Sequence, residues 1–242
     1  MFINISNEKN MLFLVNYWEI KIIYMYKYIL ADEKNWAIFE KDNATYIKSK
    51  QTDFVRKDAN YLEKIIFSIK TFENAIDCGA CYGFWTYLLQ PYFNKIYAFE
   101  LVNAHRLCFL KNMNNFNIKN FELFPFGLGH KNFKCLVGNE QGFIDKFGYA
   151  AFNAQVVEDK NGQENVRTLD SFNLDNISFI KIDVEGYELN LLKGAQETIE
   201  KNKPVIFIEK TITKYDDIKS FLNNYNYDLV EEFEKDALFK AK

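Results

Sequence analysis

The fold is decided by one stretch of sequence, NAIDCGACYGFWTYLL at residues 74–89. It begins as a short apolar strand, turns at two glycines and continues as the start of a helix, which is the pattern of a nucleotide-binding turn. Gly79 allows a sharp turn and a close approach to a ligand, and Gly83 allows the new helix to pack closely against its strand. The free N–H groups at the helix start can then face an anion.

An acidic residue ends the next strand, KIYAFE at residues 95–100. There the Glu100 carboxylate can accept hydrogen bonds from both hydroxyls of a ribose, so the sequence predicts a nucleoside ligand. Cys78 occupies the place of the first glycine in the dinucleotide pattern G-x-G-x-x-G, which argues against a nicotinamide dinucleotide.

Two patterns carry a family resemblance. The D-x-G-x-x-x-G turn with its acidic strand end resembles the class I S-adenosylmethionine (SAM) methyltransferases, and a second run, KIDVEG at residues 181–186, resembles the FkbM family of methyltransferases. The resemblance covers roughly residues 55–240 and includes residues 168–172, 192–195 and 203–209. It implies an α/β, Rossmann-like fold: a seven-stranded, mostly parallel sheet with helices on both faces and an antiparallel last strand pair.

The resemblance also implies a cofactor site for SAM. It places Asp77 beside the methionine amino group, although Asp77 could instead only brace the turn. The other residues expected at the cofactor are Gly79, Ala80, Cys81, Gly83 and Glu100, with Phe126 and Gly127 at the adenine. Many methyltransferases carry an acidic residue at the adenine amine, and this chain has none there, so backbone groups would supply that contact.

The candidate catalytic residues are Lys181, Asp183, Glu185 and Glu209. Asp77, Glu100, Asp183 and Glu209 each end a predicted strand, so their carboxylates should ring one crevice at the carboxyl edge of the sheet. Lys181 shares a strand face with Asp183 and could simply pair with Asp183 or Glu209. Glu185 could be no more than a helix cap. We assign no metal ligand; Mg²⁺ between Asp183 and Glu209 is the less favoured alternative to a carboxylate base.

The expected function is methyl transfer to a hydroxyl group, because the amine-methylating motif Asn/Asp-Pro-Pro-Tyr is replaced by KIDVEG. Resemblance to FkbM proteins implies a sugar hydroxyl of a glycan or glycolipid, or a secondary metabolite, as acceptor. Two alternatives stay open, because a Rossmann-like fold does not decide function: an NAD-dependent oxidoreductase and a catalytically inactive SAM-binding module.

The cysteines and histidines allow other interpretations. Cys78-Gly79-Ala80-Cys81 could be a redox pair, but redox chemistry does not explain Gly83 or Glu100, and a zinc site would need two more ligands. Four scattered cysteines suit a reducing cytosol, so we expect a cytoplasmic protein. We interpret His105 as structural and keep His130 as a base candidate.

Composition limits the classes of partner. The chain has 242 residues, 48% of them hydrophobic, and a net charge of −3, which argues against a nucleic-acid-binding surface. Charged residues interrupt the apolar run Met11 to Leu30, so we expect no transmembrane segment there but an amphipathic element on the core. We divide the chain into an accessory segment, 1–54, and a methyltransferase domain, 55–242. The oligomeric state stays open.

Local patterns predict individual elements. Residues 36–40 and 44–48 should form a hairpin, and residues 58–70 a helix with Asp58 as its N-cap. Strands and helices then alternate from residue 73 to residue 125, and residues 133–157 should form an inserted hairpin or lid that faces the acceptor in the resembling family. One helix is expected over Tyr187 to Glu200, and a closing antiparallel pair after residue 226.

Overall fold

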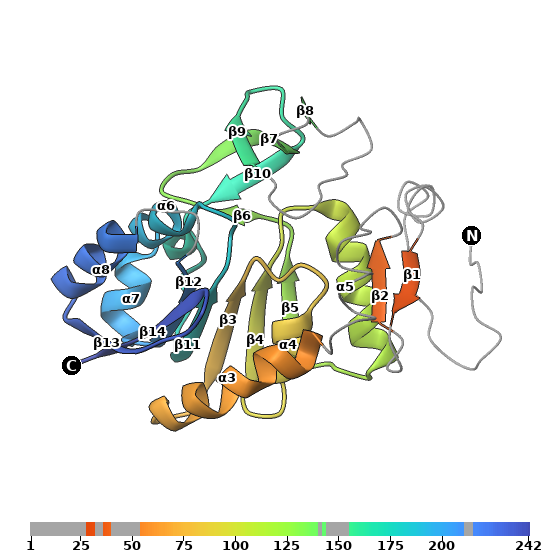
Figure 1. Ribbon diagram of the computed structural model, residues 1–242. Helices are drawn as coiled ribbons and strands as arrows, with labels where there is room; N and C mark the ends of the chain where they lie inside the picture. Colours follow the sequence, from red (N-terminus) through yellow and green to blue (C-terminus); the bar gives the residue numbers. More distant parts are fainter. Residues whose placement is uncertain (1–27, 32–35, 40–53, 140–141, 144–154, 211–214) are drawn as a thin grey trace.

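The protein is built around one seven-stranded sheet. The computed structural model describes residues 28–31, 36–39, 54–139, 142–143, 155–210 and 215–242 (Figure 1). The strand order is β13-β14-β12-β11-β3-β4-β5. Their bounds are Asn74–Cys78 (β3), Lys95–Phe99 (β4), Phe121–Phe124 (β5), Ile177–Ile182 (β11), Val205–Glu209 (β12), Tyr227–Glu232 (β13) and Asp236–Ala241 (β14). β14 runs antiparallel to both neighbours and the other pairs are parallel. The prediction of a Rossmann-like, mostly parallel sheet with an antiparallel last pair is confirmed.

Helices cover both faces of this sheet because its strands are apolar on both sides. One face carries α3 (Phe54–Ser68), α4 (Phe84–Leu89) and α5 (Asn103–Asn115), and the other carries α6 (Glu188–Lys193), α7 (Gln196–Asn202) and α8 (Tyr215–Asn224) (Figure 1). Alternate strand residues divide between two clusters: Ala75 and Phe179 pack under the first group of helices, Ile76 and Ile180 under the second.

A second sheet lies over the edge where β3, β4 and β11 end (Figure 1). It contains β6 (Gly127–Leu128), β7 (Phe133–Asn139), β8 (Gly142–Phe143), β9 (Gln155–Glu158) and β10 (Glu164–Arg167). The predicted hairpin or lid is therefore larger than expected, because β7 pairs with β8, β9 and β10, and β10 also pairs with β6. The predicted β-piece from Tyr149 lies largely outside the described residues.

The prediction of a single helix over Tyr187 to Glu200 is wrong, because the helix is interrupted at residues 194 and 195, between α6 and α7. A Cβ added at Gly194 would lie 2.0 Å from the carbonyl oxygen of Gly129, so the two backbones pack directly. Asp170, in the short 3-10 helix Leu169–Phe172, accepts the N–H groups of Glu197 and Thr198 at 3.1 and 2.8 Å. A side chain distant in sequence thus supplies the start signal of α7.

The N-terminal part adds a small antiparallel pair, β1 (Tyr28–Ala31) and β2 (Trp36–Phe39), against α5 (Figure 1). Trp36–Phe39 is a strand, but its partner among the described residues is β1; the second arm predicted at residues 44–48 lies outside them. Asn112 of α5 accepts the Ala37 N–H at 2.6 Å and donates to the Ala37 carbonyl at 2.9 Å. Its side chain therefore holds β2 on the helix.

Helix α3 begins earlier than the sequence predicts. The prediction of Asp58 as its N-cap is wrong, because α3 already begins at Phe54. Across the described stretches, no helix combines the length and the apolar character that a membrane crossing requires. Most of the apolar run from Met11 lies outside those stretches.

Candidate active site

The glycine turn after β3 is shaped by its neighbours. Gly79 has φ +76°, its N–H donates to the Phe99 carbonyl at 3.0 Å, and an added Cβ would lie 1.9 Å from the Asp183 carbonyl oxygen. Gly83 has φ +90°, and a Cβ there would lie 2.7 Å from Met113 Cε. The element that needs Gly83 is therefore α5, rather than the strand named in the sequence-based prediction. Both positions require glycine for conformation and for space.

A pocket opens between this turn and the second sheet. It is lined by five of the predicted cofactor residues, Gly79, Cys81, Glu100, Phe126 and Gly127, and by two of the predicted catalytic residues, Asp183 and Glu185. The other five predicted site residues, Asp77, Ala80, Gly83, Lys181 and Glu209, are not among the described residues that line it. The structure thus brings together the ends of β3, β4 and β11 around one space.

Glu100 lies at the inner wall of the pocket, 6% exposed. Its carboxylate accepts the N–H of Cys81 at 2.8 Å and of Val102 at 2.7 Å, and lies 3.5 Å from His105 Nδ1. Burial alone would raise the pKa of Glu100, but the His105 hydrogen bond and charge and the two backbone donors lower it overall. A carboxylate that is held in its charged form can still accept hydroxyl hydrogen bonds on its remaining lone pairs.

Asp77 and Lys181 form a buried charge cluster beneath the turn. They are paired residues on adjacent strands, and their side chains are 0% and 3% exposed. Lys181 Nζ donates to the Gly79 carbonyl at 3.0 Å and lies 3.6 Å from Asp77 Oδ1 and 3.5 Å from Asp183 Oδ2. Burial opposes the Lys181 charge, yet the carboxylates of Asp183 and Asp77 raise the pKa of Lys181 overall. The Thr86 hydroxyl donates to Asp77 at 2.7 Å, so this cluster links β3, α4, β11 and the turn.

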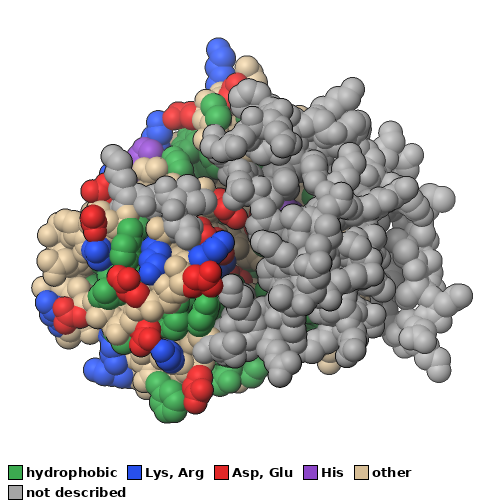
Figure 2. Space-filling view, in the orientation of Figure 1, with side chains coloured by type: hydrophobic (Ala, Val, Ile, Leu, Met, Phe, Trp, Pro, Cys, Tyr) green, Lys and Arg blue, Asp and Glu red, His purple; other side chains and the backbone are tan. Residues whose placement is uncertain are grey.

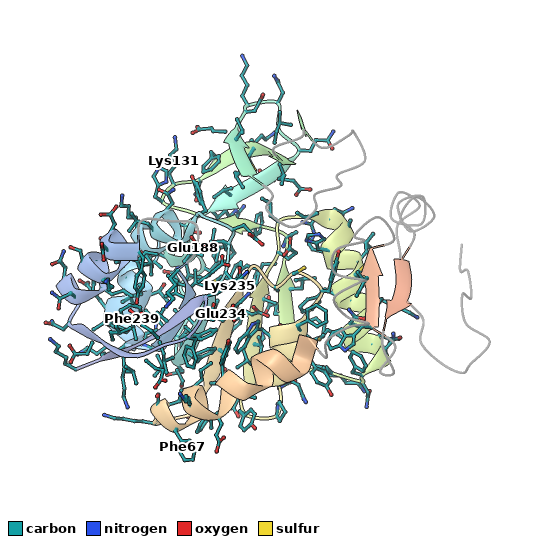
Figure 3. All side chains as sticks on the ribbon, in the orientation of Figure 1. Phe67, Lys131, Glu188, Glu234, Lys235 and Phe239 are labelled. Atoms are coloured by element: carbon teal, nitrogen blue, oxygen red, sulfur yellow. The ribbon has the colours of Figure 1, made fainter. Side chains whose placement is uncertain are left out.

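The carboxylates after β11 have distinct positions. The Asp183 side chain is 41% exposed and lines the pocket, as does Glu185, whose backbone has φ +53°. The turn that follows β11 is held by Glu188 rather than by Glu185, because the Glu188 carboxylate accepts the N–H groups of Val184 and Gly186 at 3.2 and 3.0 Å. Glu188 is the first residue of α6 (Figure 3) and is 1% exposed, and burial raises its pKa.

Glu209 ends β12 next to Asp183, since Ile208 and Ile182 are paired. Among the residues that the structure describes, no group of three or more His, Cys, Asp or Glu side chains is arranged to hold a metal ion.

The sequence did not predict the apolar wall of the pocket or the position of His105. Val137, Val156 and Val166 line the pocket from the second sheet, and Leu101 and Tyr187 line it from loops. Only the β-like composition of residues 133–157 hinted at this wall. His105 lies in the first turn of α5, only five residues after Glu100, and that spacing could have indicated a contact between them. His130 is exposed and is not among the described lining residues.

Around the pocket, the Arg167 guanidinium lies 4.2 Å from the ring centre of Phe126, a cation–π contact that holds this aromatic side chain. On the face shown in Figure 2, acidic and basic side chains are interspersed over the described part. Most of the residues that line the pocket are apolar, and its carboxylates are those of Glu100, Asp183 and Glu185, at the ends of β4 and β11.

The strand order, the glycine turn after β3 and the acidic end of β4 are those of a Rossmann-like, class I methyltransferase fold. The sequence model of the "Methyltransferase FkbM domain" matches residues 77–229, more than half of the chain. The protein therefore belongs to the FkbM family of SAM-dependent methyltransferases. No curated protein matches the chain significantly.

Several methyltransferases are among the solved structures similar to the chain. One is methyltransferase FkbM from Methylobacillus flagellatus KT, at 16% identity and TM-score 0.48, covering 87% of this chain and 56% of that one. A second is SMU.1697c, a putative methyltransferase from Streptococcus mutans in complex with SAH, at 14% identity and TM-score 0.45, covering 76% of this chain and 94% of that one. A third is a precorrin-6y C5,15-methyltransferase from Geobacter metallireducens GS-15, at 13% identity and TM-score 0.48, covering 87% of this chain and 95% of that one. The chain thus spans little more than half the length of the Methylobacillus protein.

Proposed function

We propose that this protein transfers a methyl group from SAM to a hydroxyl oxygen, on a sugar of a glycan or glycolipid or on a secondary metabolite. One observation supports the proposal: Glu100, the expected acceptor of ribose hydrogen bonds, and Asp183, the expected base, line the same pocket. SAM fits the residues present, because Gly79 and Cys81 of the turn line the same pocket as Glu100, whose carboxylate can accept ribose hydroxyls. When bound, SAM supplies an electrophilic methyl group.

The chain's own residues then divide into two roles. Gly79, Ala80 and Cys81 of the turn, Glu100, and Phe126 and Gly127 would hold the cofactor, while Asp77, Gly83 and Lys181 fix the turn from beneath. Asp183 would take the proton from the acceptor hydroxyl, with Glu185 and Glu209 as neighbouring carboxylates. Such a base contributes typically ~10²- to 10⁴-fold to the rate. The apolar wall of Val137, Val156 and Val166 would exclude water around the transferred group.

The chemical class of the acceptor is the most specific part of the proposal. It rests on family membership and on KIDVEG in place of an amine-methylating motif. Cytoplasmic location and a polysaccharide-modifying role belong to the same proposal.

The first test is calorimetric titration with SAM, S-adenosylhomocysteine (SAH) and NAD, with and without Mg²⁺. We expect both adenosyl ligands to bind and NAD not to bind. NAD binding without SAM binding would support the oxidoreductase alternative, whereas SAM binding without transfer to any hydroxyl in a glycan panel would support the inactive module.

Two variants separate the roles of the carboxylates. Glu100→Gln should weaken SAM binding by at least about 1 kcal/mol, because it removes a charged acceptor. The control Glu122→Gln, on the exposed Lys95–Glu122 pair of β4 and β5, should bind SAM like the wild type. Asp183→Asn should bind SAM normally and lose ~10²-fold or more in turnover. Equal losses of binding and turnover in Asp183→Asn would instead make Asp183 a cofactor or structural residue.

A further inference from the structure

The pocket contains the one accessible thiol of the chain. All four cysteines lie in the described residues, and no disulfide joins any two of them. Cys78, Cys108 and Cys135 are buried at 0%, 2% and 0% exposure, whereas Cys81 is partly exposed and lines the pocket. A reagent that enters the pocket therefore meets Cys81, and the other three thiols are shielded by the core.

Cys81 is held next to an ion pair. The imidazole of His105 hydrogen-bonds to the Cys81 side chain and lies 3.5 Å from the Glu100 carboxylate. The Cys81 N–H donates to the same carboxylate at 2.8 Å, which fixes a backbone with φ +47°. Three elements thus converge: the glycine turn, the end of β4 and the first turn of α5.

Charges of both signs surround the thiol. Burial alone would lower the pKa of His105, but the side chains of Cys81 and Glu100 raise it well above its ordinary value, which favours the protonated imidazole. Lys181, on β11, also interacts electrostatically with Cys81. Glu100 opposes the thiolate, as do the pocket carboxylates Asp183 and Glu185, while the two cations favour it. An adjacent imidazolium is the environment that lowers the pKa of reactive cysteines.

We propose that Cys81 is a modification site, a nucleophilic thiolate that reacts with soft electrophiles such as small disulfides inside the cofactor pocket. In that reaction the Cys81 sulfur attacks one sulfur of the disulfide, the S–S bond breaks, and a mixed disulfide forms. The other half leaves as a thiolate and takes a proton from water. The adduct then occupies the space between Gly79 and Glu100, so it excludes SAM; this second part rests on the proposed function.

The test of reactivity needs no cofactor. The protein is treated with iodoacetamide, and separately with glutathione disulfide, and the modified peptides are quantified by mass spectrometry. We expect Cys81 to react at about pH 7 at least ~10-fold faster than free glutathione, with a pH midpoint below the usual value of about 8.5. Cys78, Cys108 and Cys135 are internal controls and should remain unmodified in the folded protein.

Variants test the role of His105. His105→Gln should slow alkylation at about pH 7 by ~10-fold and approach the wild-type rate at about pH 10, because base then replaces the imidazolium in forming the thiolate. His130→Gln, an exposed histidine, should react like the wild type. If Cys81 in the wild type reacts no faster than glutathione and has an ordinary pH midpoint, the proposal is overturned without reference to any variant.

SAH separates this inference from the proposed function. Saturating SAH should slow Cys81 alkylation ~10-fold or more, and the glutathionylated protein should fail to bind SAH until it is reduced. SAH binding without protection would overturn the blocking of the pocket. Failure of SAH to bind the unmodified protein would count against the proposed function alone, since the alkylation rate still decides the reactivity of Cys81.

Discussion

At the scale of single residues, Lys181 decides whether the glycine turn keeps its shape. It is a buried cation between the buried carboxylate of Asp77 and the pocket carboxylate of Asp183. Lys181→Met should lower the free energy of unfolding by about 3 to 5 kcal/mol, because the variant leaves Asp77 as an uncompensated buried charge. Urea unfolding at neutral pH measures the change.

The matched control is Lys95→Met. Its salt bridge to Glu122 is exposed, with side chains 41% and 46% accessible, so the loss should stay below about 1 kcal/mol. If both variants lose the same stability, the cluster under the turn is not the brace that its geometry indicates.

At the scale of elements, the start of α7 after the break that follows α6 depends on Asp170. Its carboxylate accepts the Glu197 and Thr198 N–H groups and the Thr198 hydroxyl. Asp170→Ala should cost about 1 to 2 kcal/mol, as the loss of a helix cap does, and should speed hydrogen exchange of the Glu197 and Thr198 amides. Asp175→Ala, which removes only an exposed ion pair with Lys201, should change stability by less than about 0.5 kcal/mol. Unchanged exchange at α7 in Asp170→Ala would contradict the capping role.

At the scale of the whole molecule, strand β2 of the N-terminal pair shares the main core. Trp36 is 1% exposed and contacts Phe84 of α4 and Phe116 after α5 at ring distances of 4.5 and 4.6 Å. The division into 1–54 and 55–242 stays a proposal, and this packing indicates that the described part of the accessory segment melts together with the domain. Trp36→Ala should therefore destabilise the entire protein by about 3 to 5 kcal/mol in one cooperative transition.

Phe67→Ala is the control for this prediction. Phe67 is 82% exposed and projects from the end of α3 (Figure 3), so its removal should leave the melting curve almost unchanged. A Trp36→Ala protein with a wild-type transition would show that the N-terminal strands are energetically separate from the sheet.

The sequence by itself determined the features that depend on neighbours along the chain. The apolar runs of β3, β4, β11 and β12 and the turn at Gly79 are local patterns, and the acidic residue at the end of β4 is placed by the strand before it. Parallel strands of an α/β sheet end at one edge, so the meeting of Glu100 and Asp183 in one pocket could also be expected.

Only the tertiary structure decided which charged groups face the pocket and which lie beneath it. Asp77 and Lys181 both follow apolar strand residues, but their burial arises from the pairing of strands whose partner residues are 103 to 104 positions apart in sequence, and from α4 covering that face. The break at Gly194 comes from contact with Gly129, and the apolar wall comes from pairing within the second sheet. Local sequence propensity cannot predict such contacts, because their free energy depends on surfaces that meet only after the chain has folded.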